Sequence, residues 1–89
     1  MTIGALWSGV APDSVLPTAA NAAAELTTVE ASDLSVVAGS ARIIVRFTAD
    51  DAAAAVRVGR HVVTATQVVA EPLSSAVTER VNGHWDVVR

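Results

Sequence analysis

Apolar and polar positions in the first quarter of the chain follow first a strand period and then a helix period. Ile3–Ser8 is a short apolar run, which predicts a strand, and Gly9–Pro12 has turn composition. From Val15 to Leu26 the apolar residues recur on one stripe at helical spacing, which predicts a helix. Asp13 and Ser14 precede this stripe and are both candidate N-caps.

The middle of the chain changes to β-branched and alternating residues. Strands are predicted over Val29–Val37 and Arg42–Phe47, joined by the loop Ala38-Gly39-Ser40. A glycine-containing loop of about three residues between two strands is typical of a hairpin. A second helix is expected from Asp51 to about Val58, with Asp50 as its N-cap.

The last third of the chain carries both helix and strand signals. Gly59 is expected close to the end of the second helix, and the β-branched run Val62–Val69 predicts a strand, which Pro72 ends. Leu73–Val81 is interpreted as a short closing helix, followed by a turn and a terminal strand.

An alternative reading of the C-terminus also fits. Asn82-Gly83 lies between Thr78–Val81 and His84–Val88, and this dipeptide between two such runs is a type I′ hairpin signal. We therefore expect one domain over residues 1–81 and a C-terminal turn and possible strand over 82–89.

The resulting order, β-α-β-β-α-β plus an appendix, predicts an α/β (α+β) fold of the ferredoxin-like kind. In that arrangement two helices cover one face of a four-stranded antiparallel sheet. The other face has no cover from the predicted elements. Ile44, Val62 and Val68 suggest that both faces of the sheet carry apolar side chains, so we expect the chain to form oligomers.

Composition strengthens this expectation. The chain has 89 residues, and 52% are apolar, mostly Ala and Val, with one Phe, two Trp and no Tyr. Such a chain forms a single thin core that is marginally stable alone. Absence of Cys excludes disulfides and thiolate sites, and absence of Lys excludes Schiff-base chemistry.

Charge and hydropathy narrow the classes of partner. The formal charge is −3, and the six arginines are scattered rather than clustered, which argues against nucleic-acid binding. No apolar run approaches the roughly 18–20 residues of a membrane span. The N-terminus lacks the pattern of a signal peptide, so a cytoplasmic protein is expected.

Candidate catalytic residues are few and do not form a recognised motif. His61 and His84 are interpreted as a helix-end and a turn residue rather than as a base or metal ligands. Asp50 and Asp51 suit helix capping better than paired acid/base work. Asp33, on an apolar strand, faces solvent or is buried with a perturbed pKa. We expect no catalytic residues, no metal and no cofactor, and hence a protein that is not an enzyme.

Several segments, taken in order, resemble bacterial microcompartment shell proteins. Ile3-Gly4-Ala5-Leu6 followed by the helix Ala19–Glu30 is similar to the opening of that domain, and Val37–Ser40 to its short pore loop. Ile43–Arg46, Ala54–Gly59 and Val68–Pro72 are similar to its later strand, second helix and last strand. The resemblance covers about residues 2–81.

The resemblance implies a structural shell protein that forms cyclic hexamers. Ala38, Gly39 and Ser40 would line a central pore for small polar or anionic metabolites, and Glu25 takes the place of the lysine at the hexamer edge. The implied partners are further copies of the chain, other shell proteins and enclosed enzymes, in the cytoplasm.

Two readings from other classes remain open. One is a ferredoxin-like dimer that binds a small ligand, or acts on it as the α+β-barrel oxygenases do. It would use Trp7, His61, His84 and Trp85 around a cavity on the open sheet face. The other is a regulatory module that binds an amino acid at a subunit boundary.

Overall fold

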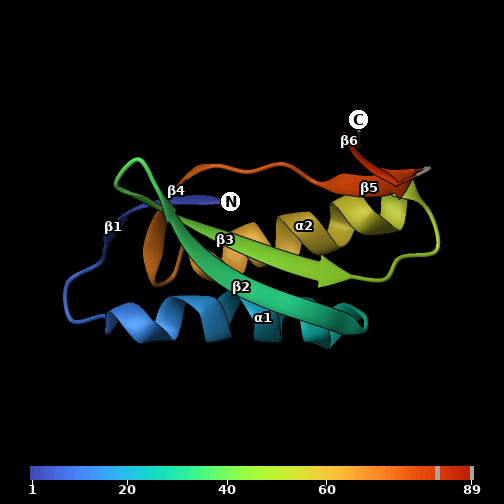
Figure 1. The fold of residues 1–89 in the computed structure, drawn as a ribbon. Helices are drawn as coiled ribbons and strands as arrows, with labels where there is room; N and C mark the ends of the chain where they lie inside the picture. Colours follow the sequence, from blue (N-terminus) through green and yellow to red (C-terminus); the bar gives the residue numbers. More distant parts are fainter. Residues whose placement is uncertain (82, 89) are drawn as a thin grey trace.

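Two helices lie on one side of a four-stranded antiparallel sheet whose strand order is β2-β3-β1-β4 (Figure 1). The computed structural model describes residues 1–81 and 83–88, without the side chains of Val81 and His84. The elements are β1 (Thr2–Leu6), a 3-10 turn η1 (Pro12–Ser14), α1 (Val15–Leu26), β2 (Val29–Val37), β3 (Ser40–Phe47), α2 (Ala52–Thr66), β4 (Ala70–Ser74), β5 (Thr78–Val81) and β6 (His84–Val87).

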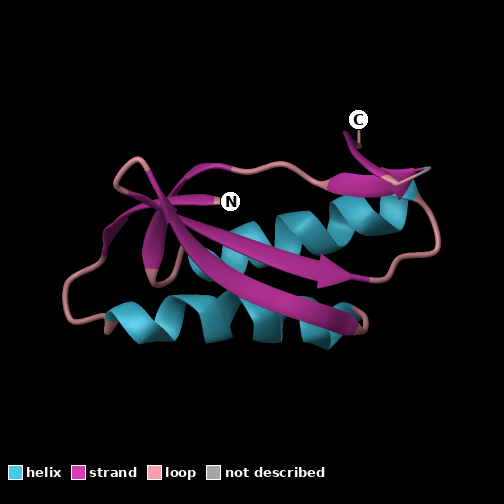
Figure 2. Cartoon of the chain, viewed as in Figure 1, coloured by secondary structure: helices cyan, strands magenta, loops and turns pink. Residues whose placement is uncertain are grey.

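The predicted fold class is confirmed. The order β1-α1-β2-β3-α2-β4 and the pairing of the first and last strands of that unit are those of a ferredoxin-like α+β fold. Strands β5 and β6 form a separate two-stranded sheet beyond this unit, which we call the C-terminal hairpin (Figure 2).

Small apolar side chains fill the space between the helices and the sheet. Ala19 and Ala23 of α1 and Ala70 of β4 are fully buried, which allows close approach of backbone to backbone. The other buried apolar side chains are Ile3, Val15, Ala22, Ile43, Val58 and Val62. The core is thin, as the Ala- and Val-rich composition predicts.

The β2–β3 hairpin is the longest ladder in the sheet. Its register runs from Val29 opposite Phe47 to Val37 opposite Ser40, with one irregularity near Val29. The predicted bounds of β2 are therefore correct. The connection is shorter than expected, because Ser40 pairs with Val37 and only Ala38 and Gly39 remain in the turn.

Helix α2 differs from its prediction at both ends. The N-cap is Asp51, whose carboxylate accepts a 2.7 Å hydrogen bond from the Ala54 backbone N–H, so the choice of Asp50 was wrong. The helix runs to Thr66, and the predicted strand over Val62–Val69 does not form. Val58, Val62 and Thr66 recur every four residues, and this buried helical stripe outweighs the strand preference of β-branched residues.

The C-terminal third is built from strands rather than a closing helix. The predicted helix over Leu73–Val81 is absent, because β4 includes Pro72 and ends at Ser74, and β5 begins at Thr78. Strands β5 and β6 pair antiparallel, with Val81 opposite His84, and Gly83 has φ 84°, so the alternative hairpin reading is the correct one. Asn82 lies outside the described residues, and the predicted boundary at 81/82 falls between β5 and β6.

The two sheet faces differ in exposure. Ile44, Arg42 and Arg46 of β3 point to the face without helices, and Ile44 is 53% exposed. Val62 and Val68 were also expected to lie in the sheet, but neither does. Val62 is a buried residue of α2, and Val68 is an exposed residue between α2 and β4. Asp33, opposite Ile44, is exposed and accepts a hydrogen bond from the Leu34 N–H.

Candidate functional site

The predicted pore loop forms the turn of the β2–β3 hairpin. Ala38 and Gly39 are exposed and have φ values of 53° and 80°. Both values lie in the left-handed region, so the turn has the type I′ character that suits the twist of two antiparallel strands. Ser40 is half-buried and begins β3. The structure thus presents two small residues at the tip and the third in the strand behind them.

Glu25, the predicted edge residue, is joined to the second helix. Its Oε2 lies 2.9 Å from Nε2 of His61, and the two side chains are 66% and 37% exposed. His61 lies inside α2, which runs to Thr66, and not at a helix end as expected. Its contact with Glu25 joins α2 to the end of α1. An exposed pair of this kind contributes on the order of 0–1 kcal/mol.

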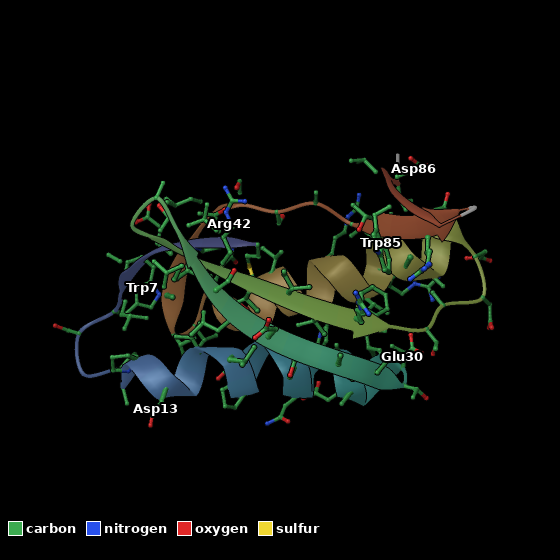
Figure 3. The ribbon with its side chains drawn as sticks, in the orientation of Figure 1. Trp7, Asp13, Glu30, Arg42, Trp85 and Asp86 are labelled. Atoms are coloured by element: carbon green, nitrogen blue, oxygen red, sulfur yellow. The ribbon has the colours of Figure 1, made fainter. Side chains whose placement is uncertain are left out.

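Of the residues in the ligand-cavity reading, Trp7, His61 and Trp85 are not brought together. Trp7 and Trp85 lie at opposite ends of the molecule (Figure 3). Trp7 donates from Nε1 to the Gln67 carbonyl at 2.6 Å, and Trp85 lies with its ring centre 5.3 Å from the Arg46 guanidinium carbon. His61 bonds to Glu25, and the side chain of His84 lies outside the described part.

A large groove lies between β3, α2 and the C-terminal hairpin, with a volume of about 1420 Å³. Residues 43–47 of β3 form one wall, and α2 from Ala52 to Thr64 forms the floor. Residues 75–80, with Trp85, Val87 and Val88, form the other wall. Sequence reasoning missed this groove, because it misplaced both α2 and the hairpin. A second hollow of about 290 Å³ lies between Leu26, Asp50 and Arg57.

The N-terminal amine is part of the sheet. Met1 donates from its amine to the Ile43 carbonyl at 2.9 Å and accepts from the Ile43 N–H at 2.8 Å. Partial burial lowers the pKa of the Met1 amine below its ordinary value of 8.0, and the positive charge of Arg42 lowers it further.

The two adjacent carboxylates, Asp50 and Asp51, lie at the start of α2. Asp51 is used as a helix cap, and Asp50 lies in the bend before it. Across residues 1–81 and 83–88, no three carboxylate or imidazole groups converge in a way that could hold a metal ion. Neither of the two helices described is long and apolar enough to cross a bilayer.

Comparison of the chain with protein-family models, curated proteins and solved structures finds no match.

Proposed function

We propose that this chain is a structural subunit that assembles into rings of six around a central pore, in the manner of the microcompartment shell proteins that its sequence resembles. Each subunit would contribute the turn Ala38-Gly39 and the following Ser40 to the pore lining. The proposal assigns no catalytic step to the chain and places it in a cytoplasmic shell, with other shell proteins and enclosed enzymes as partners.

The observation that carries the proposal is the geometry of that turn. Two small exposed residues stand at the end of a long hairpin, and both have positive φ. Small side chains leave a narrow opening unobstructed, and the backbone N–H groups of such turns favour anions. Six copies around an axis would form a ring suited to small polar or anionic molecules.

Exposed apolar side chains support association between copies. Val36 is 71% exposed on the edge strand β2, and Leu73 is 58% exposed on β4, the opposite edge of the sheet. A single chain with apolar residues on both edges suits head-to-tail contacts, which close into rings when the rotation between copies permits. At the outer edge, the Glu25–His61 pair would replace the lysine of the family.

The experiment is a measurement of oligomeric mass by light scattering, followed by negative-stain imaging. The proposal predicts six times the 9.1 kDa of one chain and ring-shaped particles. Ser40→Leu tests the pore separately: it should preserve the ring and narrow its opening, because residue 40 lies in β3 and has no positive φ. A monomeric or dimeric wild type would refute the proposed assembly.

A further inference from the structure

Strand β2 is an outer strand of the sheet, and within the described part of the chain it pairs only with β3. In an antiparallel ladder, two opposite residues either exchange both backbone hydrogen bonds or exchange neither. Ile43 lies opposite Leu34 but bonds in both directions with Met1, so it exchanges neither bond with Leu34. The N–H and C=O groups of Leu34 therefore point away from β3, toward the open edge of the sheet.

The outward N–H of Leu34 is already occupied by a side chain of its own strand. The neighbouring residue, Asp33, accepts a hydrogen bond from it through Oδ1 at 2.8 Å. Hydrogen bonds with a charged acceptor are stronger than those between neutral groups. A strand that approached this edge would have to displace the carboxylate before its own carbonyl could bind the N–H of Leu34.

The rest of the β2 edge has the character of a strand that accepts a partner. It has nine residues without a proline, and most of them are exposed. Leu34, Val36 and Val37 are 47%, 71% and 43% exposed. Long exposed edge strands with apolar side chains tend to pair with other chains, and native proteins block such edges with charged side chains, among other devices.

The sequence of β2 is compatible with pairing to itself. An antiparallel pair of β2 strands about a two-fold axis at Leu34 sets Leu34 opposite its own copy and Ser32 opposite Val36. Asp33 then lies opposite Ser35, so no two charges of the same sign stand directly opposite each other. A second copy of β2 is therefore a partner that fits this edge.

We propose that Asp33 closes the β2 edge to pairing with the β2 strand of a second copy. Its carboxylate occupies the outward donor at the centre of the strand, the N–H of Leu34. In the two-fold pair, the two copies of Asp33 would also lie diagonally across the axis on one face and repel each other. The proposed ring uses a different contact, head-to-tail between β2 and β4, so the inference does not depend on the ring.

Disulfide formation at residue 34 tests the proposal, because the chain contains no Cys to interfere. Leu34→Cys places one thiol at the two-fold axis. In this background, Asp33→Ala frees the N–H of residue 34 and should raise the yield of cross-linked dimer several-fold at equal protein concentration. Glu30→Gln is the matched control, because it removes one negative charge from the same strand and leaves Asp33 in place. Its yield should stay near that of Leu34→Cys alone.

Asp33→Asn separates the hydrogen bond from the charge. Its amide oxygen can still accept from the N–H of residue 34, so its yield should lie below that of Asp33→Ala. Equal yields for these two variants, or a yield for Asp33→Ala no higher than for Glu30→Gln, would overturn the proposal. Light scattering reports the six-subunit mass separately, so failure of the ring and failure of this inference are distinguishable.

Amide hydrogen exchange in dilute protein provides a second measurement that needs no association. The N–H of Leu34 should exchange several-fold faster in Asp33→Ala than in the wild type, because its acceptor is gone. The N–H of Ser35 should change little, since alternate residues of β2 point toward β3. Equal exchange of the Leu34 N–H in the two proteins would overturn the proposal.

Discussion

Gly59 in the middle of α2 lies directly against Val77, the residue before β5. A β-carbon on Gly59 would overlap the Cγ2 methyl of Val77. Absence of a side chain at residue 59 therefore lets the C-terminal segment lie against α2. This contact explains a glycine in a helix interior, where it costs about 1 kcal/mol relative to Ala.

Gly59→Ala tests this relationship. We expect a lower free energy of unfolding, because overpacking costs about 1–3 kcal/mol and the gain in helix propensity offsets only part of it. Urea unfolding of Gly59→Ala, Val77→Ala and the double variant measures the coupling. The double variant should be more stable than Gly59→Ala alone; additive effects of the two substitutions would show that the contact is absent.

Asp51→Ala should destabilise the protein by about 1 kcal/mol, because it removes the carboxylate that accepts from the Ala54 N–H. Asp50→Ala is the matched control on the neighbouring carboxylate and should change stability by less than about 0.5 kcal/mol. Thermal unfolding followed by circular dichroism compares the two. A larger loss of stability for Asp50→Ala than for Asp51→Ala would show that Asp50, as predicted from the sequence, is the N-cap.

Ala23 and Ala24 are neighbours with opposite environments, since Ala23 is fully buried and Ala24 is exposed. Ala23→Leu should cost about 1–3 kcal/mol, because the extra carbons have no space between α1 and the sheet. Ala24→Leu should remain within about 0.5 kcal/mol of the wild type. Denaturant midpoints give both values, and similar midpoints for the two variants would contradict the thin, closely packed core.

Gly39 has φ 80° and an open surrounding, so only backbone strain opposes a side chain there. Gly39→Val should lose about 1–2 kcal/mol, because a β-branched residue tolerates that region poorly. Gly39→Asn should be nearly neutral, since Asn adopts positive φ readily. Urea titrations of both variants check this, and equal losses would show that the turn is not of the type I′ kind.

The Met1 amine makes stability depend on pH. Its pKa is lowered in the folded chain, so between the folded pKa and about 8 the unfolded chain binds more protons. The free energy of unfolding should therefore rise with pH through that window and level off above it. Acetylation of Met1 removes the titrating group and keeps an N–H for the Ile43 carbonyl. The free energy of unfolding of the free protein, minus that of the acetylated protein, should increase with pH through this window. A decrease with pH would contradict the prediction.

The sequence predicted the elements whose patterns are local. The bounds of α1 and β2 agree with those expected. A helical stripe defines α1, and an alternating segment with valines at both ends defines β2, without help from distant residues. The β2–β3 turn was also expected, with Gly39 as its marker. These features place the candidate pore residues, although Ser40 belongs to the strand.

What the sequence did not reveal depends on contacts between distant segments. Gly59 was interpreted as a helix end, but its role is to accommodate Val77, 18 residues later in the chain. The run after Val62 has strand propensity, and only burial of Val62 and Thr66 against the sheet fixes it as helix. The groove and the bond between Glu25 and His61 follow from that longer helix, so neither could be read from local patterns.

The sheet order also sets how far apart in the sequence the paired strands lie. Strands β2 and β3 are adjacent in the chain and can pair as soon as their two-residue turn has formed. Strand β1 is made first, yet one of its neighbours is β4, in which Ser74 pairs with Thr2 across most of the chain. Pairing of β1 with β4 therefore requires β4 to have been synthesised, and closing so long a loop costs more chain entropy than closing the β2–β3 hairpin.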